Sequence, residues 1–500
     1  MTMSAEMKFQ PHPLLMDHVV ENILLSMDSD LLGHYCKIFR LVCKDWTRIA
    51  TRVYKAKRGR IVFKRNFIGK VSGLFIRVMK TSSNIPFQNF KFCSDSYDDE
   101  YFTELLHVCG GSISVLDLNI VNPCNLKFPK EFPDLVLGRL RKLIFHVRLD
   151  CFEVVQTEMA SLLETLFRIS PKLEILDLKV LRGVSRTVRN TQMSLTALTK
   201  FGEVLSTQLP DGVRDLKLHI TINDSQLREL NKRRLNLRRL DVYFQQSELS
   251  TEALQEFFEK CGPRLINCKV LGNQFITQKV QFPVFPCLEY LSALGRAPKY
   301  LEYAKLFPSL QRLEICLWDS FDDIFPPNCY STTLQHIIFP YQVGSPAIFQ
   351  RMGNCFPNLR KLTQVVVTSS EALVSIFKSL KTLQMLDICF GYDFQTSVSL
   401  DTLFTGISDC SVLVKYSEEQ VQAEIGRYNV DSIRNLKELR YLSIMAAPLT
   451  MPSTARITDI SVYYGLLQMK NLSIVKLDYF PISIPCLEVL RKRVNLQRPV

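Results

Sequence analysis

The residue types best suited to catalysis and metal binding are scattered along this chain. Its 15 cysteines include no C-x-x-C pair, and the closest two pairs, Cys36 with Cys43 and Cys261 with Cys268, are seven residues apart. The seven histidines occur singly. A zinc site needs clustered thiolates or imidazoles, and nucleophilic catalysis needs a nucleophile with a supporting base. The motifs G-x-x-x-x-G-K-[ST], G-x-G-x-x-G, H-E-x-x-H and G-x-S-x-G are also absent, so we expect a protein with no catalysis, metal or cofactor of its own.

The composition indicates a folded chain with excess positive charge. Hydrophobic residues make up 47% of the 500 residues and charged residues 22%, which excludes wholesale disorder. The net charge of +13 favours acidic partners without choosing among a protein surface, a phosphate and a nucleic acid. No apolar run approaches the roughly 18 residues of a membrane span. Because Pro11 and Pro13 also make the N-terminus a poor secretory signal, we expect an intracellular protein of the cytoplasm or nucleus, with reduced cysteines and no membrane partner.

Most of the chain carries one recurring pattern, apolar-x-x-apolar-x-apolar. Clear copies are LEILDL at 173–178, LQRLEI at 310–315 and LQMLDI at 383–388. Five successive central positions, spaced by 22, 24, 25 and 24 residues, are Leu291, Leu313, Ile337, Leu362 and Leu386. Each such unit has a one-sided apolar face that only its neighbours can bury, so this period predicts a solenoid of stacked repeats. An ordinary α/β sheet would explain one copy but not a dozen in register.

Proline precedes several copies, as in FPSL at 307–310, where it ends the preceding helix. The array resembles the leucine-rich-repeat family over about residues 110 to 495. The resemblance implies an α/β leucine-rich-repeat solenoid, or horseshoe, occupying residues 110–500. Two longer intervals, 40 residues from Leu176 to Leu216 and 56 residues from Leu386 to Leu442, predict projecting loops. The second interval also predicts a degenerate repeat near Leu413.

Two amphipathic helices are predicted ahead of the array. The apolar stripe of the first contains Val19, Ile23 and Met27, and that of the second contains Ile38, Val42, Trp46 and Ile49. Such spacing places each set on one helical face. Since the chain has only two tryptophans, Trp46 in this short basic segment suggests either a core residue or part of a docking face.

The segments ILLSMD at 23–28 and LVCKDW at 41–46 resemble the F-box family. Two features depart from the family pattern: Leu15 and Met16 stand where a Leu-Pro pair is usual, and the stretch between the two segments is about one turn longer. The resemblance implies a small all-α F-box domain at residues 10–55. A tail at 1–9 would precede it, and a junction with the first degenerate repeats would follow at 56–109.

F-box domains bind the Skp adaptor of cullin-RING ubiquitin ligases, and an F-box ahead of leucine-rich repeats is a familiar substrate-receptor architecture. The resemblance therefore implies a non-catalytic subunit that binds Skp, and through it a cullin, and recruits a protein substrate for ubiquitination. Adaptor binding would insert apolar side chains into a groove. The predicted adaptor-binding residues are Val20, Ile23, Leu24, Met27, Leu41, Val42 and Trp46.

The residues between the apolar positions of each repeat are expected to face a concave surface. Their charges alternate in sign, which favours a folded protein or peptide partner over nucleic acid, since nucleic acid would require a stripe of positive charge. The charged residues predicted to contact substrate are Lys217, Asp241, Lys269, Glu314 and Asp387.

Basic residues concentrate at 52–65, 232–239 and 491–493. The first cluster follows the F-box and is expected to meet an acidic adaptor surface. The second suits phosphate capture, as in the plant hormone-receptor F-box proteins, which hold an inositol phosphate. Two alternatives therefore stay open. One is a leucine-rich-repeat scaffold outside any ligase, whose helices only cap the solenoid, and the other is a basic repeat protein that binds nucleic acid or inositol phosphate.

Overall fold

The structure of the protein is a computed structural model. It describes residues 17–26, 35–58, 60–63, 70–81, 87–94, 99–120, 135–149, 153–182, 191–220, 222–244, 250–272, 281–294, 302–316, 325, 329–339, 342–343, 345–407, 419–420, 431–445, 457–478 and 480–496. The chain forms two compact units, Met1–Asn236 and Leu237–Val500.

The first unit contains a helix pair and a parallel sheet. The pair consists of α1 (Asp17–Ser26) and α3 (Lys44–Arg58). Each strand of the sheet pairs in parallel with the next one in sequence. The strands are β1 (Arg60–Phe63), β2 (Asn89–Ser94), β3 (Val115–Ile120), β4 (Lys142–Leu149), β5 (Ile175–Arg182) and β6 (Asp215–His219). The connecting helices are α4 (Lys70–Thr81), α5 (Asp99–Cys109), α6 (Glu153–Ile169), α7 (Thr191–Gln208) and α8 (Asp224–Lys232).

The second unit has a parallel sheet of the same kind. Its strands are β7 (Arg239–Phe244), β8 (Asn267–Gly272), β9 (Tyr290–Leu294), β10 (Arg312–Cys316), β11 (His336–Ile338), β12 (Gln342–Val343), β13 (Lys361–Ser369), β14 (Met385–Gln395), β15 (Tyr441–Met445), β16 (Ile474–Asp478) and β17 (Asn495–Leu496). Its helices are α9 (Thr251–Cys261), α10 (Tyr303–Leu306), α11 (Pro346–Cys355), α12 (Ser370–Ser379), α13 (Leu400–Thr405), α15 (Asp459–Tyr464) and α16 (Ile484–Arg493). Both β11 and β12 pair with β13, and the other strands pair in sequence order.

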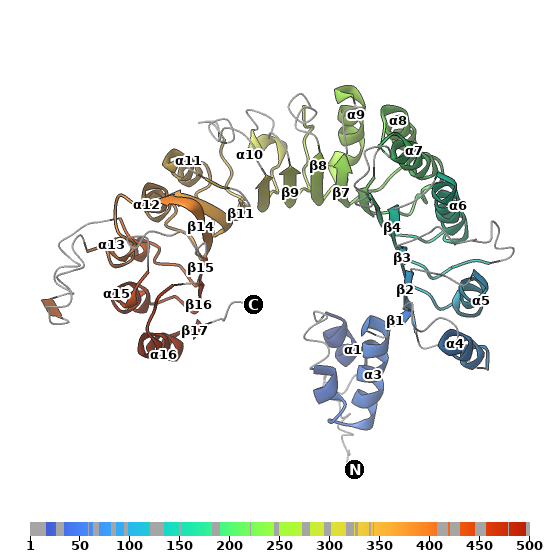
Figure 1. Ribbon diagram of the computed structural model, residues 1–500, viewed down its shortest axis with the longest axis horizontal. Helices are drawn as coiled ribbons and strands as arrows, with labels where there is room; N and C mark the ends of the chain where they lie inside the picture. Colours follow the sequence, from blue (N-terminus) through green and yellow to red (C-terminus); the bar gives the residue numbers. More distant parts are fainter. Residues whose placement is uncertain are drawn as a thin grey trace, which may run out of the picture. The chain divides into compact units, whose positions relative to one another are not determined.

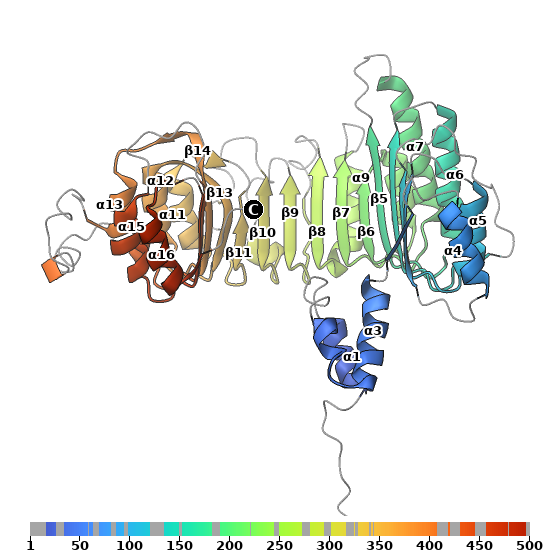
Figure 2. The same cartoon turned by 60° about the horizontal axis from the view of Figure 1, so that its bottom comes forward.

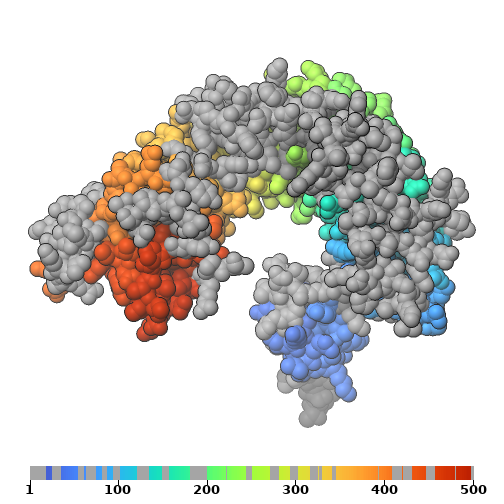
Figure 3. All heavy atoms as spheres, viewed as in Figure 1, coloured from blue at the N-terminus to red at the C-terminus, as the bar shows by residue number. Residues whose placement is uncertain are grey.

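The connecting helices of each unit lie on one face of its sheet (Figures 1 and 2). The opposite face is formed by the strand residues and is called the helix-free face below. In the space-filling view the orange and red part of the second unit, around α13, α15 and α16, is one continuous packed body (Figure 3). The strand and its return helix therefore form a layer that stacks on the next layer.

The repeated apolar positions set the register of both sheets. Aligned central residues are Leu143, Leu176 and Leu216 in the first unit, and Leu386, Leu442 and Val475 in the second. All six are 0% exposed. Burial of one leucine side chain contributes about 1.5–3 kcal/mol, and here that burial depends on the neighbouring repeat. The predicted α/β repeat solenoid is confirmed as the architecture of each unit.

The F-P-x-L motifs form anchored turns before the strands. The Leu310 N–H donates to the Phe307 carbonyl at 3.1 Å, and the Leu359 N–H donates to the Phe356 carbonyl at 3.1 Å. These bonds close β-turns with proline at the second position, which its fixed φ favours. Both phenylalanine rings are buried and lie near Tyr303, with centroids 6.1 and 5.9 Å away. The phenylalanine therefore fixes the turn to the core, a role beyond that of the proline, which was predicted to end the preceding helix.

The long intervals are insertions within single repeats. Strand β14 pairs directly with β15 although 56 residues separate Leu386 from Leu442, so no repeat strand lies between them. The predicted degenerate repeat near Leu413 is wrong in this respect, and Leu413 itself lies outside the described residues. The predicted junction at 56–109 already contains β1 and β2, and α3 continues past residue 55 to Arg58.

Gly353 lies where α11 packs closely against the end of α12. A Cβ atom here would be 2.4 Å from the backbone oxygen of Ser379. Alanine normally stabilises a helix interior by about 1 kcal/mol relative to glycine. Because a backbone oxygen cannot rotate away, we predict instead that Gly353→Ala lowers the free energy of unfolding by about 1–3 kcal/mol.

Chemical unfolding followed by circular dichroism measures this difference. Gly138→Ala is the matched control, since nothing lies within 4 Å of its added Cβ. An equal loss in both variants would contradict the packing argument.

Candidate protein-interaction surfaces

The helix pair has a small apolar core. Its buried members, each at most 2% exposed, are Val20, Leu24, Cys36, Ile49, Ala50 and Val53. The partly buried rings of Phe39 and Trp46 pack against this core. The two rings are stacked with centroids 4.8 Å apart and an interplanar angle of 23°. Trp46 therefore covers the edge of the helix-pair core.

The second predicted helix is interrupted by a turn. Residues 35–39 are helical, the chain turns at 40–42, and α3 follows. The turn is closed by Leu41 N–H, which donates to the Ile38 carbonyl at 2.9 Å, and by Val42 N–H, which donates to the Phe39 carbonyl at 3.2 Å. As a result Leu41 and Val42 are 87% and 56% exposed. The predicted continuous stripe through residues 38–49 is therefore wrong, and residues 40–43 are called the Leu41–Val42 turn.

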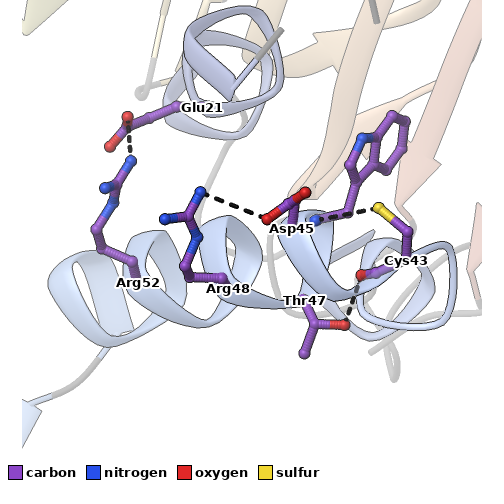
Figure 4. Close-up of polar contacts among 7 residues, drawn as sticks. Glu21, Cys43, Asp45, Thr47, Arg48 and Arg52 are labelled. Atoms are coloured by element: carbon purple, nitrogen blue, oxygen red, sulfur yellow. Dashed lines mark hydrogen bonds and ion pairs between the residues drawn. The ribbon is translucent and has the colours of Figure 1, made fainter. Parts of the chain in front are cut away.

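Polar contacts fix the start of α3 (Figure 4). The Thr47 hydroxyl donates to the Cys43 carbonyl at 2.9 Å, and the Trp46 N–H donates to the Cys43 Sγ at 3.5 Å. The Arg52 guanidinium pairs with the Glu21 carboxylate at 2.5 Å and links α3 to α1. Since both side chains of this pair remain partly exposed, it contributes less than about 1 kcal/mol. The turn thus depends mainly on the hydrogen bonds and on the apolar core.

The predicted adaptor-binding residues do not share one surface. The structure places Val20 and Leu24 in the core, Ile23 and Trp46 in half-buried positions, Leu41 and Val42 on the surface, and Met27 outside the described residues. The stripe on α1 faces α3, so in this structure a partner would reach the two core residues only through their neighbours. The exposed part of the prediction is the Leu41–Val42 turn.

The middle residues of the repeats form lines along the helix-free faces. In register these are Lys91, Asp117, Ile144, Asp177 and Lys217 in the first unit; in the second they are Asp241, Lys269, Ser292, Glu314, Ile338 and Thr363, then Asp387, Ser443 and Lys476. The alternation of charge predicted from the sequence is therefore a lateral alternation in space. Of the five residues predicted to contact substrate, Lys217 is exposed and the other four are half-buried. Their role in binding stays a prediction.

Asp177 is held as an anion on the first unit's helix-free face. Its Oδ1 lies 3.0 Å from the Nε2 of His146. Burial raises the pKa of Asp177, but the hydrogen bond with His146 and the electrostatic effects of His146, Lys217 and His219 outweigh it, so the pKa lies below its ordinary value. This face therefore presents both signs of charge.

A second line of side chains on the other unit is cationic and aromatic. In register it contains Tyr290, Arg312, His336 and Lys361. The Arg312 guanidinium lies 4.9 Å from the Tyr290 ring centroid, and the Tyr290 hydroxyl donates to the Glu314 carboxylate. His336 Nε2 lies 2.9 Å from the Thr363 hydroxyl. Burial, with the positive charges of Arg312 and Lys361, lowers the pKa of His336 to about 4.

None of the three nitrogen-bearing residues of this line is among the predicted substrate contacts, although the sequence carries their signal. Arg312, His336 and Lys361 each stand immediately before the central apolar residue in three successive repeats. The predicted substrate contacts all stand immediately after that position. Because strand side chains alternate in direction, the residue two positions before the middle one shares its face.

The basic cluster at 232–239 is partly neutralised. Lys232 pairs with Glu229 at 2.5 Å, and Arg233 pairs with Asp211 at 3.1 Å. The cluster at 491–493 forms the last turn of α16, where positive charge is favourable to the helix dipole. Neither cluster is an unpaired positive stripe of the length that nucleic acid requires.

In the part of the chain that the structure describes, no group of three or more histidine, cysteine, aspartate or glutamate side chains has an arrangement suited to a metal ion. None of the described helices combines the length and the apolar character needed to cross a membrane.

Comparisons with known proteins give only distant likenesses. No protein-family model and no curated protein sequence matches the chain. A chain in the crystal structure of the Rad7 and Elc1 complex from yeast is 9% identical, with 99% of this chain and 98% of that chain covered and a TM-score of 0.35. A leucine-rich-repeat protein of Leptospira interrogans is 14% identical, with 87% and 99% covered and a TM-score of 0.33. Similarity this low does not establish a shared function.

The two classes of helix-pair residue should respond differently to charge. We predict that Leu41→Asp and Val42→Asp each change the free energy of unfolding by less than about 0.5 kcal/mol, because both side chains already contact water. Val20→Asp and Leu24→Asp should each cost at least about 2 kcal/mol, because they bury a carboxylate. Limited proteolysis around α1 and α3, with circular dichroism, distinguishes the two pairs. Equal protease resistance in all four variants would contradict the described core.

His336 should make stability depend on pH. Its pKa falls from an ordinary value of 6.5 to about 4 on folding, so between these values the unfolded chain binds a proton that the folded chain does not. We therefore predict that the free energy of unfolding falls as the pH falls through this window. His336→Gln should reduce that pH dependence, measured by chemical unfolding at about pH 7 and about pH 5. Identical pH dependence in wild type and variant would contradict the neutral state of His336.

Proposed function

We propose that this protein is the substrate-receptor subunit of a Skp-cullin-F-box ubiquitin ligase. In this proposal α1, residues 35–39 and α3 act as an F-box that binds a Skp-type adaptor, and through it a cullin. The helix-free faces of the repeats bind a protein substrate, and the chain itself performs no catalytic step. The observation that carries the proposal is the exposure of Leu41 and Val42 within LVCKDW, the segment that resembles the F-box pattern.

The Leu41–Val42 turn has the physical character of a binding anchor. Two neighbouring aliphatic side chains, 87% and 56% exposed, gain about 25 cal/mol for each Å² of apolar surface that a partner removes from water. The stacked rings of Phe39 and Trp46 and the hydrogen bonds from Thr47 hold the turn in one conformation before binding. Such pre-organisation lowers the entropic cost of association. Small clusters of buried anchors supply most of the affinity in many interfaces.

The alternative scaffold function does not account for the exposed side chains of the Leu41–Val42 turn. A helix pair that only caps a solenoid needs its core, which Val20 and Leu24 supply. It has no need of a leucine that is 87% exposed. The proposed ligase function accounts for both the buried and the exposed apolar residues of the segment.

Recruitment then works by proximity. A substrate held on the repeats is tethered to the ligase through the helix pair, which raises its effective concentration near the ubiquitin-carrying enzyme. The mixed charges of the helix-free faces, such as Asp177 beside Lys217, favour selection among folded or peptide partners over general polyanion binding.

The test is binding of the purified full-length chain to a purified Skp-type adaptor. We expect a stoichiometric complex on size-exclusion chromatography. Leu41→Asp and Val42→Asp should each cost about 2 kcal/mol or more, roughly thirtyfold in affinity by calorimetry.

Tyr54→Asp is the matched control, because it places the same charge on a different apolar residue of the helix pair. Tyr54 lies in α3 and is 39% exposed. It should leave adaptor binding unchanged. If the folded wild type does not bind the adaptor, or if Tyr54→Asp weakens binding as much as Leu41→Asp, the ligase proposal is wrong and the scaffold function replaces it.

A further inference from the structure

Three nitrogen-bearing side chains lie side by side on the helix-free face of the second unit. Arg312 on β10 is in register with His336 on β11, which is in register with Lys361 on β13. Adjacent strands are about 4.8 Å apart, so the Cα atoms of Arg312 and Lys361 are about 10 Å apart. That span allows both side chains to reach one tetrahedral anion between them. We call these three residues the cationic line.

The positive charge of the cationic line is not cancelled by ion pairs. Among the described residues, neither Arg312 nor Lys361 forms an ion pair, and both are exposed. The nearest acidic residue on β10, Glu314, accepts a hydrogen bond from Tyr290. His336 lies between these two cations, and burial together with their positive charge lowers its pKa.

Two contacts orient the cationic line before any ligand arrives. The Arg312 guanidinium lies over the Tyr290 ring, a favourable cation–π geometry. The Nε2 of His336 is held 2.9 Å from the Thr363 hydroxyl. Fixed donors lose less entropy on binding than free ones.

A strained backbone segment of β13 follows directly after Lys361. Between Leu362 and Val365, β13 has three steps where β14 has two, so one residue is extra. At the bulge, Gln364 has a φ of 59°. It is the one non-glycine residue with a positive φ among the described residues, and the Gln364 side chain is exposed. This left-handed conformation costs about 1–3 kcal/mol and concentrates at functional sites. Bulges also redirect side chains next to binding sites.

We propose that the helix-free face of β10, β11 and β13 binds a phosphorylated segment of a protein, with the phosphate held between Arg312 and Lys361 and beside His336. A guanidinium matches the oxygens of a phosphate in a forked pair of hydrogen bonds, and lysine adds a point charge. The cationic line covers only three strands and is bordered by Glu314 and Asp387, so it fits one phosphorylated side chain and excludes a long polyanion.

This inference rests on the proposed function in one respect, because it names the chemistry of the substrate that the ligase would recruit. Peptide binding needs no adaptor, however. The Leu41→Asp variant should therefore keep full phosphopeptide affinity, and failure of the adaptor test would leave the phosphopeptide test unaffected.

The experiment is fluorescence polarisation of the full-length chain with a labelled degenerate peptide pool that carries a central phosphoserine. We expect binding at least about tenfold tighter than to the unphosphorylated pool. The double variant Arg312→Ala, Lys361→Ala should lose that preference. Arg312→Lys, which keeps the charge and removes the fork, should lose part of it, so a folding defect in the alanine variant would not leave the question open.

Lys437→Ala, Lys470→Ala is the matched control, since it removes two exposed positive charges from turns of the same unit. It should bind as wild type does. Equal binding of both pools would overturn the inference. So would an equal loss in the control variant. Tighter binding to a single-stranded DNA oligonucleotide than to the phosphopeptide pool would replace it with a general polyanion surface.

Discussion

The structure depends on the fact that each repeat can bury only one of its faces, and only against its neighbours. The aligned leucines are fully buried because the next strand is parallel and in register with them. A slip of the strand pairing by one residue would turn those leucines to water and their polar neighbours to the core. Such a slip would cost much free energy, so the register is strongly specified. The same register aligns the side chains on the helix-free faces. Side chains that are 22–25 residues apart in sequence become neighbours at strand spacing.

The Leu41–Val42 turn and the helix-free faces of the repeats would bind partners through different interactions. The helix pair has a core of six small and medium side chains, and Leu41 and Val42 are the most exposed of the large apolar side chains described in it. The exposed apolar side chains described on the strands, Val62, Tyr243 and Met445, are 39%, 37% and 39% exposed, well below Leu41. The sheet faces instead differ from place to place in their charged side chains. Examples are the Asp177–His146 contact in the first unit and the cationic line in the second. The first surface is suited to an invariant partner bound by apolar contact, and the second to selection by charge.

The repeats could be predicted from the sequence because their period and their burial have the same cause. The turn at 40–42 could not, because Ile38, Val42 and Trp46 keep helical spacing across it and neither glycine nor proline marks the break. The 56-residue interval was ambiguous for another reason: lengthening a loop costs little free energy, so an insertion and an additional repeat look alike in sequence. The cationic line was predictable from three successive repeats. Its coincidence with the bulge was not, since Gln364 carries no signal for positive φ.

The bulge in β13 also restores the phase of the strand. Strand side chains alternate with a period of two, and Leu362 and Val365, which are three residues apart, both face the core because the bulge absorbs the one additional residue between them. Without the bulge, a regular strand of the same sequence would turn Val365, Val366 and Val367 to the opposite faces relative to β14. The bulge therefore lets β13 carry one residue more than β14 while its valines keep their faces, and the connection between β14 and β15 absorbs added length in a loop. Related sequences should differ in length at the connection, and a β13 that lacks the additional residue should also lack the bulge.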